Sequence, residues 1–313
     1  MSLGQLDLVC IGNLVADVIV RSVDVLPPVG QLGLVDAIDL RGGGGGFTTA
    51  SAMARLGGRT ALFGMVGDDD FGRYLVELLE PLGVDCQNVT TLVGYATAST
   101  AVIVNTAGQR TYLHAPGVNA FLSVEHLNLA VLFSSRALHI AGALINPRLD
   151  GEPSATILAE AQRRGMHTSL DTSWDSTGQW QRILPALPHL DVFAPSWDEA
   201  HAITGENDPA HIVGWLRDHG ARTVVVKLGA DGAYADGMGF RGHVPAYPVT
   251  AVDSTGAGES FNAGLIYGIL AGWTLERSTR LGAAVGALAV SAVGAADGIT
   301  GLPDAMALAG LTS

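Results

Sequence analysis

Strand–helix alternation along the second half of the chain constrains its fold more than any other sequence feature. Apolar strand patterns at 137–142, 168–170, 192–194 and 223–228 are interleaved with helical patterns at 153–164, 179–184, 196–204 and 208–219. Repeated strand–helix units favour a mostly parallel sheet covered by helices on both faces. No linker is long enough to split the 313 residues. We therefore predict an α/β fold and a single domain spanning residues 1–313.

The first half of the chain adds strands of a different kind. Residues 6–13 and 60–67 read as buried strands, and a helix is expected over 73–82. Residues 21–40 alternate and contain prolines and glycines, which predicts a small antiparallel excursion. Residues 97–104 and 109–114 predict a hairpin with 105–108 as its turn.

Polar side chains and glycines follow several of the predicted parallel strands. In such sheets, ligands gather beyond the carboxyl ends of the strands. Asp171, Ser196, Glu199 and Gly229 all lie at predicted strand ends. Their clustering makes each of them a stronger candidate for ligand binding than it would be alone.

Residues 252–264 predict a turn that opens a helix. Gly256, Ala257 and Gly258 leave their backbone N–H groups unshielded, and apolar residues recur behind them at helical spacing. Unpaired N–H donors at the positive end of a helix dipole favour an anion. The carboxylates of Asp253 and Glu259 flank this turn, which makes chemical sense if a proton is removed while the anion is held.

Four other features have both a structural and a functional interpretation. The glycine run 42–46 is either a flexible linker or, as we favour because a helix of small residues follows, a binding loop. It does not match the dinucleotide pattern, and no Walker A loop exists. Asp68, Asp69 and Asp70 favour a helix N-cap over a metal site. His139 favours a core position, and Asp17 is either an edge-strand surface residue or a ligand contact.

Composition narrows the choice of partners and compartment. The net charge of −13 argues against nucleic acid or an anionic membrane as a partner. Two cysteines give no disulfide framework, and neither a signal segment nor a membrane-spanning run is apparent. We expect a cytoplasmic protein.

Taken in order, these motifs resemble the ribokinase-like (PfkB) carbohydrate kinase family over residues 7–303. The resemblance rests mainly on residues 64–72 with 82–85, and on 252–264, which is similar to the family signature Asp-Thr-x-Gly-Ala-Gly-Asp-x-Phe. Supporting matches are Gly12-Asn13 with Asp17, the glycine run leading to Arg55-Leu56-Gly57, Gly117-Val118-Asn119, and Lys227-Leu228-Gly229 with Gly232.

This resemblance implies phosphoryl transfer from ATP, with Mg²⁺, to a hydroxyl group of a sugar-like small molecule. It implies a ribokinase-like central sheet with a small β lid, formed by segments near 14–40 and 97–114, and a homodimer joined through that lid. Two alternatives stay open: a nucleoside or vitamin kinase of the same family, and a catalytically weak protein that binds sugar or nucleotide for regulation.

The resemblance also implies roles for individual residues. Glu259 would be the general base, and Gly256, Ala257 and Gly258 would form an anion hole for the transferring phosphate. The remaining matches are Asp17, Gly43, Gly44, Thr48 and Asn119 for substrate; Ser196, Lys227, Gly229 and Gly232 for nucleotide; Glu199 for Mg²⁺ through water; and Asp253 and Thr255 for a monovalent cation such as K⁺.

Several positions depart from the family pattern. Glu259 stands where the family base is normally aspartate, so its longer side chain must fold back to reach the same point. Thr48, Ser196 and Ser173 replace asparagines, and Ala283 sits near where an asparagine often meets adenine. Hydroxyls donate and accept as amides do, but with a shorter reach.

Overall fold

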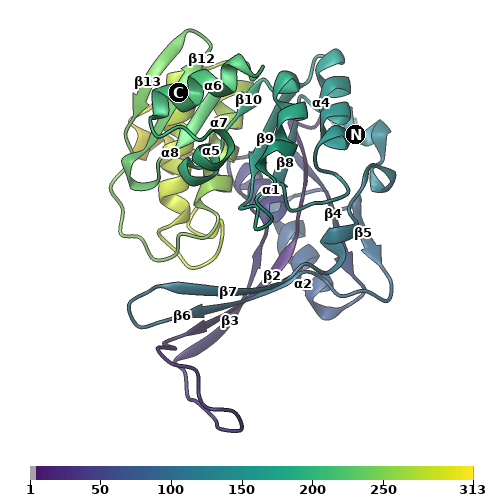
Figure 1. The fold of residues 1–313 in the computed structure, drawn as a ribbon, viewed down its shortest axis with the longest axis vertical. Helices are drawn as coiled ribbons and strands as arrows, with labels where there is room; N and C mark the ends of the chain where they lie inside the picture. Colours follow the sequence, from purple (N-terminus) through teal and green to yellow (C-terminus); the bar gives the residue numbers. More distant parts are fainter. Residues whose placement is uncertain (1–4, 313) are drawn as a thin grey trace.

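The computed structural model describes residues 5–312, which form two sheets and the helices that cover them (Figure 1). The strands are β1 (Leu8–Gly12), β2 (Val15–Arg21), β3 (Ala37–Gly43), β4 (Thr60–Gly67), β5 (Val89–Leu92), β6 (Ser99–Val104), β7 (Arg110–Ala115), β8 (Ala137–Ala143), β9 (His167–Thr172), β10 (Val192–Phe193), β11 (Val224–Lys227), β12 (Ala233–Gly237) and β13 (Phe240–Val244). The α-helices are α1 (Gly45–Arg55), α2 (Asp70–Leu79), α3 (Leu129–Leu132), α4 (Glu152–Arg163), α5 (Trp197–Thr204), α6 (Pro209–Asp218), α7 (Ala257–Leu270), α8 (Leu275–Ala289) and α9 (Leu302–Ala309).

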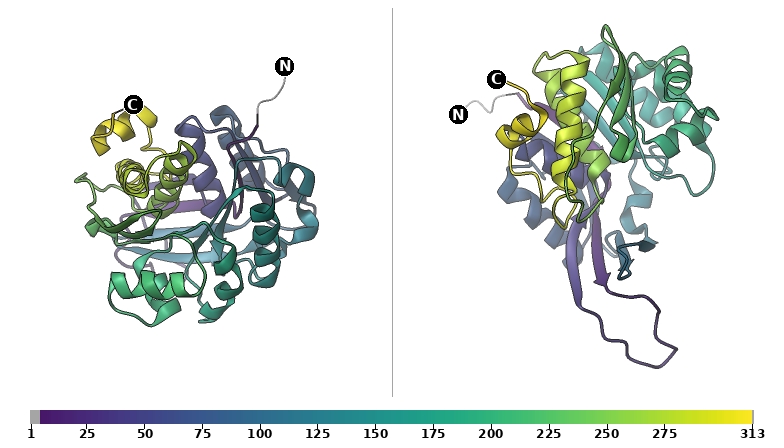
Figure 2. Two further views of the ribbon diagram at one scale, coloured as in Figure 1. Left: turned by 90° about the horizontal axis from the view of Figure 1, so that it is seen from above. Right: turned by 90° about the vertical axis from the view of Figure 1, so that its left-hand side faces the viewer.

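The larger sheet has the strand order β13-β12-β11-β10-β9-β8-β1-β4-β5 among the described residues. Every neighbouring pair from β11 to β5 is parallel, and only the β11–β12 and β12–β13 pairs, at one edge, are antiparallel among the described residues. Helices lie on both faces (Figure 2). One apolar core packs α4 and α6 against the sheet, and a second packs α1, α7 and α8 against the other face. The predicted α/β sheet is therefore confirmed.

The smaller sheet, with strand order β3-β2-β6-β7, projects from the body as the predicted lid (Figure 1). The β6–β7 hairpin and its turn at 105–108 lie where the sequence places them. The antiparallel excursion differs in extent: β2 and β3 pair over 15–21 and 37–43, while 22–36 form a long loop. Pro27 and Pro28 lie in that loop, and proline cannot donate to a ladder.

The glycine run is divided between three structural roles, so the linker interpretation is wrong. Gly42 and Gly43 end β3, Gly44 is the N-cap of α1 with φ +89°, and Gly45 begins the helix. The short helix expected at 179–184 is instead a 3₁₀ segment, Trp180–His189, because Pro185 and Pro188 interrupt α-helical bonding.

Two further expectations are confirmed. Asp69 caps α2, its carboxylate accepting a hydrogen bond from the backbone N–H of Gly72. His139 is buried, with Nδ1 2.9 Å from Ser169 Oγ, and burial lowers its pKa to about 3. The single-domain prediction covers residues 1–4 and 313, which lie outside the described residues, and it stays a prediction. Among residues 5–312, no helix is long and apolar enough to cross a membrane.

Candidate active site

The carboxyl ends of the parallel strands bring several predicted residues together. Asp171 lies near the end of β9, Ser196 follows β10, and Lys227 ends β11. A backbone bridge pairs Ser196 with Lys227. The N-terminus of α7 approaches the same edge, because Gly258 lies against the Lys227 side chain.

The first turn of α7 has the geometry expected of an anion hole. Gly256 is the N-cap with φ +75°, and no side chain caps the helix. The Ala257 N–H reaches Ser254 O at 3.4 Å, whereas the N–H groups of Gly258 and Glu259 donate to no acceptor among residues 5–312. These donors and the helix dipole together favour a phosphate.

Only glycine fits the N-cap of α7. A Cβ on Gly256 would lie 2.3 Å from the backbone oxygen of Ala295, and a positive φ is already strained for other residues. The small-residue turn is therefore required by packing as well as by access to the backbone.

Lys227 places a positive charge beside the anion hole. Its ammonium lies 2.9 Å from Oδ1 of Asp171, and a Cβ on Gly258 would lie 3.1 Å from the same ammonium. Burial raises the pKa of Asp171 to about 7. Burial alone would lower the pKa of Lys227, but the carboxylates of Asp171, Glu199 and Glu259 outweigh it and raise that pKa. Lys227 therefore remains cationic next to the helix terminus.

Glu199 is held in place by the start of α5. Its Oε2 accepts hydrogen bonds from the Ser196 backbone N–H at 2.9 Å and from Thr172 Oγ1 at 3.0 Å. Ser196 in turn caps the helix by accepting from the Glu199 N–H. Oε1 of Glu199 accepts no hydrogen bond from the part of the chain that is described. A single oriented carboxylate suits Mg²⁺, which usually keeps several waters and binds substrate phosphates.

Asp17 lies on β2 of the lid, against the backbone of Gly43. A Cβ on Gly43 would come within 2.1 Å of Asp17 Oδ2, so glycine there makes room for the carboxylate. Burial raises the pKa of Asp17 to about 6; the Thr100 hydroxyl opposes this rise, and the charges of Asp253 and Glu259 add to it. The last two causes place Asp17 in the electrostatic field of the α7 turn.

The other predicted substrate residues lie at the start of α1 and in the segment after β7. Gly44 is the N-cap of α1 and has a positive φ that suits glycine, and Thr48 is buried in the first turn of that helix. Asn119 is also buried: its Nδ2 donates to Leu14 O at 3.0 Å, while its Oδ1 has no partner among residues 5–312. Asn119 thus anchors the chain just before β2 and keeps one acceptor available.

Gly229 and Gly232 shape the turn after β11. Gly229 has φ +59° and Gly232 has φ +92°, and a Cβ on Gly232 would lie 2.1 Å from Val244 O. The turn is therefore tight, and it begins two residues after Lys227.

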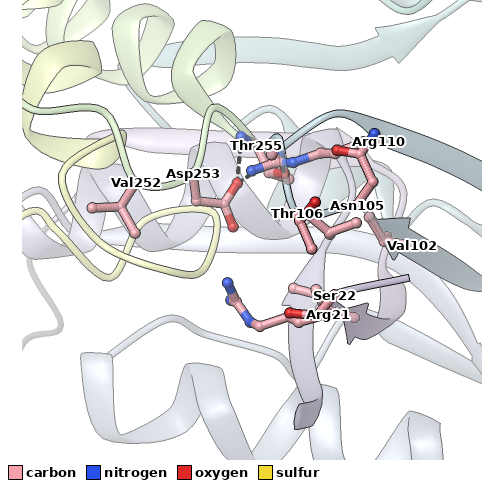
Figure 3. A pocket seen from close by; sticks show the side chains of 12 residues that line it. Arg21, Ser22, Val102, Asn105, Thr106, Arg110, Val252, Asp253 and Thr255 are labelled. Carbon is pink, nitrogen blue, oxygen red and sulfur yellow. Dashed lines mark hydrogen bonds and ion pairs between the residues drawn. The ribbon is translucent and has the colours of Figure 1, made fainter. Parts of the chain in front are cut away.

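The predicted cation residues have a partner that sequence reasoning missed. The Arg110 guanidinium, from β7 of the lid, lies 2.7 Å from Asp253 Oδ1 and 2.6 Å from Thr255 Oγ1 (Figure 3). These three side chains line a cavity of about 220 Å³ between the lid and the 252–255 loop, and Glu259 is not among its lining residues. A monovalent cation does not fit against an arginine held this way. Strand alternation places Arg110 on one face of the hairpin but does not indicate which residues it contacts.

Comparison with known proteins identifies a matching family. The profile of the pfkB family carbohydrate kinases matches residues 5–301. Fructokinase from Klebsiella pneumoniae is 30% identical over 274 residues, covering 83% of this chain and 88% of that protein. Probable fructokinase-4 from Arabidopsis thaliana is 30% identical over 259 residues, covering 78% of each.

A solved structure supports the fold. The ribokinase of Thermotoga maritima superposes with a TM-score of 0.83 at 23% identity, covering 97% of this chain and 99% of that chain. The profile match spans nearly all of the described residues, and it includes both the lid and the α7 turn. This chain therefore belongs to the pfkB family of carbohydrate kinases, which transfer phosphate from ATP to a carbohydrate.

Proposed function

We propose that this kinase phosphorylates a hydroxyl group of a sugar or sugar-like small molecule, with Glu259 as general base. The backbone amides of residues 256–258 serve as the anion hole for the transferring phosphate. The observation that carries the proposal is the first turn of α7, where unpaired N–H groups, the Lys227 ammonium and the Glu259 carboxylate converge. In this arrangement a phosphate is held while the acceptor hydroxyl loses its proton.

Each surrounding residue has a part in this scheme. Asp17 accepts hydrogen bonds from substrate hydroxyls, with Gly43, Gly44, Thr48 and Asn119 shaping the pocket around it. The nucleotide lies along Ser196, Lys227, Gly229 and Gly232. Mg²⁺, held by Glu199 through water, would neutralise charge on the phosphates. The Lys227 ammonium supplements the anion hole with a charge that does not depend on the metal.

The names of the relatives direct the choice of substrate. Both curated relatives are described as fructokinases, and the compared structure as a ribokinase. Fructose and ribose are therefore the first substrates to test. Hydroxyl-rich substrates also suit Asp17, because a carboxylate accepts several hydrogen bonds at once.

The decisive experiment measures ADP release from Mg²⁺-ATP with a panel of sugars, nucleosides and vitamins. We expect turnover with a sugar, its loss in Glu259→Gln, and retention of a substantial fraction in Glu259→Asp. Activity that survives in Glu259→Gln would refute the role of the base. Turnover restricted to a nucleoside or vitamin would reassign the substrate, and tight binding measured by calorimetry without any turnover would identify a regulator.

We also propose that two copies associate through the outer face of the lid. Residues paired across β3, β2, β6 and β7 share a face, and Asp17, Ile19 and Arg21 point toward the body. The opposite face is therefore almost entirely apolar and at least partly exposed: Val18, Val20, Ile38, Leu40, Ala101, Ile103 and Leu113. Such a face on a two-sided ribbon is typical of an interface.

Light scattering after gel filtration tests this association. We expect a mass near twice 32.3 kDa for the wild type and a monomer for Leu113→Glu combined with Ile38→Glu. Tyr112→Glu, on the opposite face of the same strand, is the matched control and should remain dimeric. A monomeric wild type, or a dimer in the double variant, would contradict the proposal.

A further inference from the structure

Arg110 makes an unusual connection between the lid and the loop that leads into α7. Its guanidinium NH1 lies 2.7 Å from Asp253 Oδ1 and donates to Thr255 Oγ1 at 2.6 Å. Only 15% of the Arg110 side chain is exposed, and 4% of that of Asp253. The contact is therefore a largely buried ion pair that joins residues 143 to 145 positions apart in the sequence.

The backbone donates two further hydrogen bonds to the Asp253 carboxylate. Oδ1 also accepts from the Thr255 N–H at 2.8 Å, and Oδ2 accepts from the Gly294 N–H at 3.3 Å. Burial alone would raise the pKa of Asp253, but the hydrogen bonds from Thr255 and Gly294 and the charge of Arg110 outweigh it and lower that pKa. Asp253 is thus an anion whose counter-charge is the lid arginine.

A monovalent cation on Asp253 and Thr255 is incompatible with this arrangement. It would have to occupy the position of the guanidinium, or lie beside it at a distance where two positive charges repel strongly. Figure 3 shows Arg110 extended across the cavity toward both side chains. Asp17 and Glu259 are the acidic groups nearby, and neither is paired with Arg110 among residues 5–312.

We infer that Arg110 replaces the monovalent cation in this kinase and acts as a positioning residue for the 253–256 loop. The inference rests on the proposed role of that loop as the beginning of the anion hole. Because Arg110 is carried by β7, the charge reaches Asp253 only when the lid lies against the body. Closure of the lid would then set the loop in the conformation in which Gly256 begins α7, and no K⁺ is needed.

The test compares cations at constant ionic strength for the wild type and Arg110→Ala. Thermal unfolding and steady-state kinetics are measured with Mg²⁺ present, in KCl, NaCl or choline chloride. For the wild type we expect unfolding temperatures that agree within about 1 °C and kcat values within twofold in all three salts. In choline chloride, the kcat of Arg110→Ala should be roughly 10²-fold below that of the wild type, because a small misplacement of the reacting groups costs about that much in rate.

Cation rescue is the readout that a merely structural arginine would not give. In Arg110→Ala, K⁺ should raise the unfolding temperature by several degrees over choline and restore kcat at least tenfold, because the vacated space then accepts a cation. Arg21→Ala is the matched control, since Arg21 lines the same cavity but pairs with Asp39. It should show no difference between K⁺ and choline.

Two outcomes would overturn the inference. One is a wild type whose kcat rises more than tenfold, or whose unfolding temperature rises by several degrees, when choline is replaced by K⁺. The other is an Arg110→Ala variant that is equally active and stable in all three salts. Unfolding temperatures are measured without turnover, so they test the role of Arg110 even if no substrate is found. The cation dependence of the wild type tests the inference even if Arg110→Ala does not fold.

Discussion

The Lys227 ammonium contacts Oδ1 of Asp171 at 2.9 Å and lies directly beside Gly258, at the N-terminus of α7. One buried ion pair thus links the end of β11 to the end of β9 and directs a positive charge at the anion hole. The pair is costly to bury, and its net contribution to stability is small compared with the cost of breaking it. Its position at the helix terminus explains why the chain retains it.

Lys227→Met should therefore damage both activity and stability. We expect kcat to fall by about 10²- to 10³-fold, since a preorganised charge at the phosphate is lost. Unfolding in urea should show a loss of about 3 kcal/mol, because Asp171 is left buried without its partner.

The double variant Lys227→Met with Asp171→Leu separates the two effects. It should recover most of the lost stability, since an apolar pair of similar volume often replaces a buried ion pair without penalty. Activity should stay low. Recovery of activity together with stability would contradict a role for the Lys227 charge in phosphoryl transfer.

The two glycines of the anion hole should respond differently to alanine. Gly256→Ala forces a side chain into a positive φ and against Ala295 O, so we expect at least about 1–3 kcal/mol of lost stability. In Gly258→Ala the new Cβ meets only the side chain of Lys227, 3.1 Å from its ammonium. Its unfolding free energy should change by less than about 1 kcal/mol, while kcat falls because the ammonium is displaced.

Calorimetric unfolding and the ADP-release assay compare the two variants directly. Equal stability losses in both would mean that the α7 turn is not constrained by Ala295. Full activity in Gly258→Ala would mean that the position of the Lys227 ammonium does not matter for transfer.

Much of the fold follows from local patterns in the sequence. Buried strands such as β8 and β9 are continuous apolar runs, and the helices between them have clear start and stop signals, so the parallel sheet is predictable. The α7 turn is equally local, because a glycine N-cap and the helix behind it lie within residues 252–270. The pairing of Asp171 with Lys227 was not predicted, although Asp171 was placed at a strand end and Lys227 was assigned to the nucleotide site.

Local sequence patterns do not predict the Arg110 contact. Its partners lie in another part of the chain, and the contact depends on how the lid folds over the body rather than on any property of the hairpin itself. The glycine run posed a similar problem. Composition alone does not reveal that Gly44 is the N-cap between β3 and α1, where Asn13 and Val15 pack against it.

Gly43→Ala should weaken sugar binding with little effect on folding. The new Cβ would lie 2.1 Å from Asp17 Oδ2, and the carboxylate can swing away at low cost because it is the end of a side chain. We expect KM for the sugar to rise about tenfold or more, with kcat and the unfolding free energy nearly unchanged. Gly214→Ala, in α6, is the control for a glycine substitution in open space, and it should leave KM unaltered. A normal KM in Gly43→Ala would argue against Asp17 as a substrate contact.

Asp17 gives the clearest pH dependence. Its pKa of about 6 in the folded chain lies above the ordinary value of 3.8, so the folded state retains the Asp17 proton more strongly than the unfolded state does. The contribution of this group to stability is thus fully present below about pH 4 and is lost as the pH rises through about 6. Asparagine does not ionise, so Asp17→Asn does not lose stability as the pH rises. At pH 7 we expect this variant to be more stable than the wild type by at most about 3 kcal/mol. Near pH 4 the two proteins should be equally stable.

Catalysis should show the opposite trend, because the ionised carboxylate is the form that accepts hydrogen bonds from the sugar. Wild-type kcat/KM for the sugar should fall as the pH drops through about 6. In Asp17→Asn this acidic limb should be absent, and KM at pH 7 should rise about 10- to 100-fold, as expected when a charged hydrogen-bond acceptor is lost.

The measurements are urea unfolding and initial rates from pH 4.5 to 8. An unchanged acidic limb in Asp17→Asn would show that another group controls it. A variant no more stable than the wild type at pH 7 would show that burying Asp17 costs little, and it would remove the physical reason for assigning this carboxylate to the substrate.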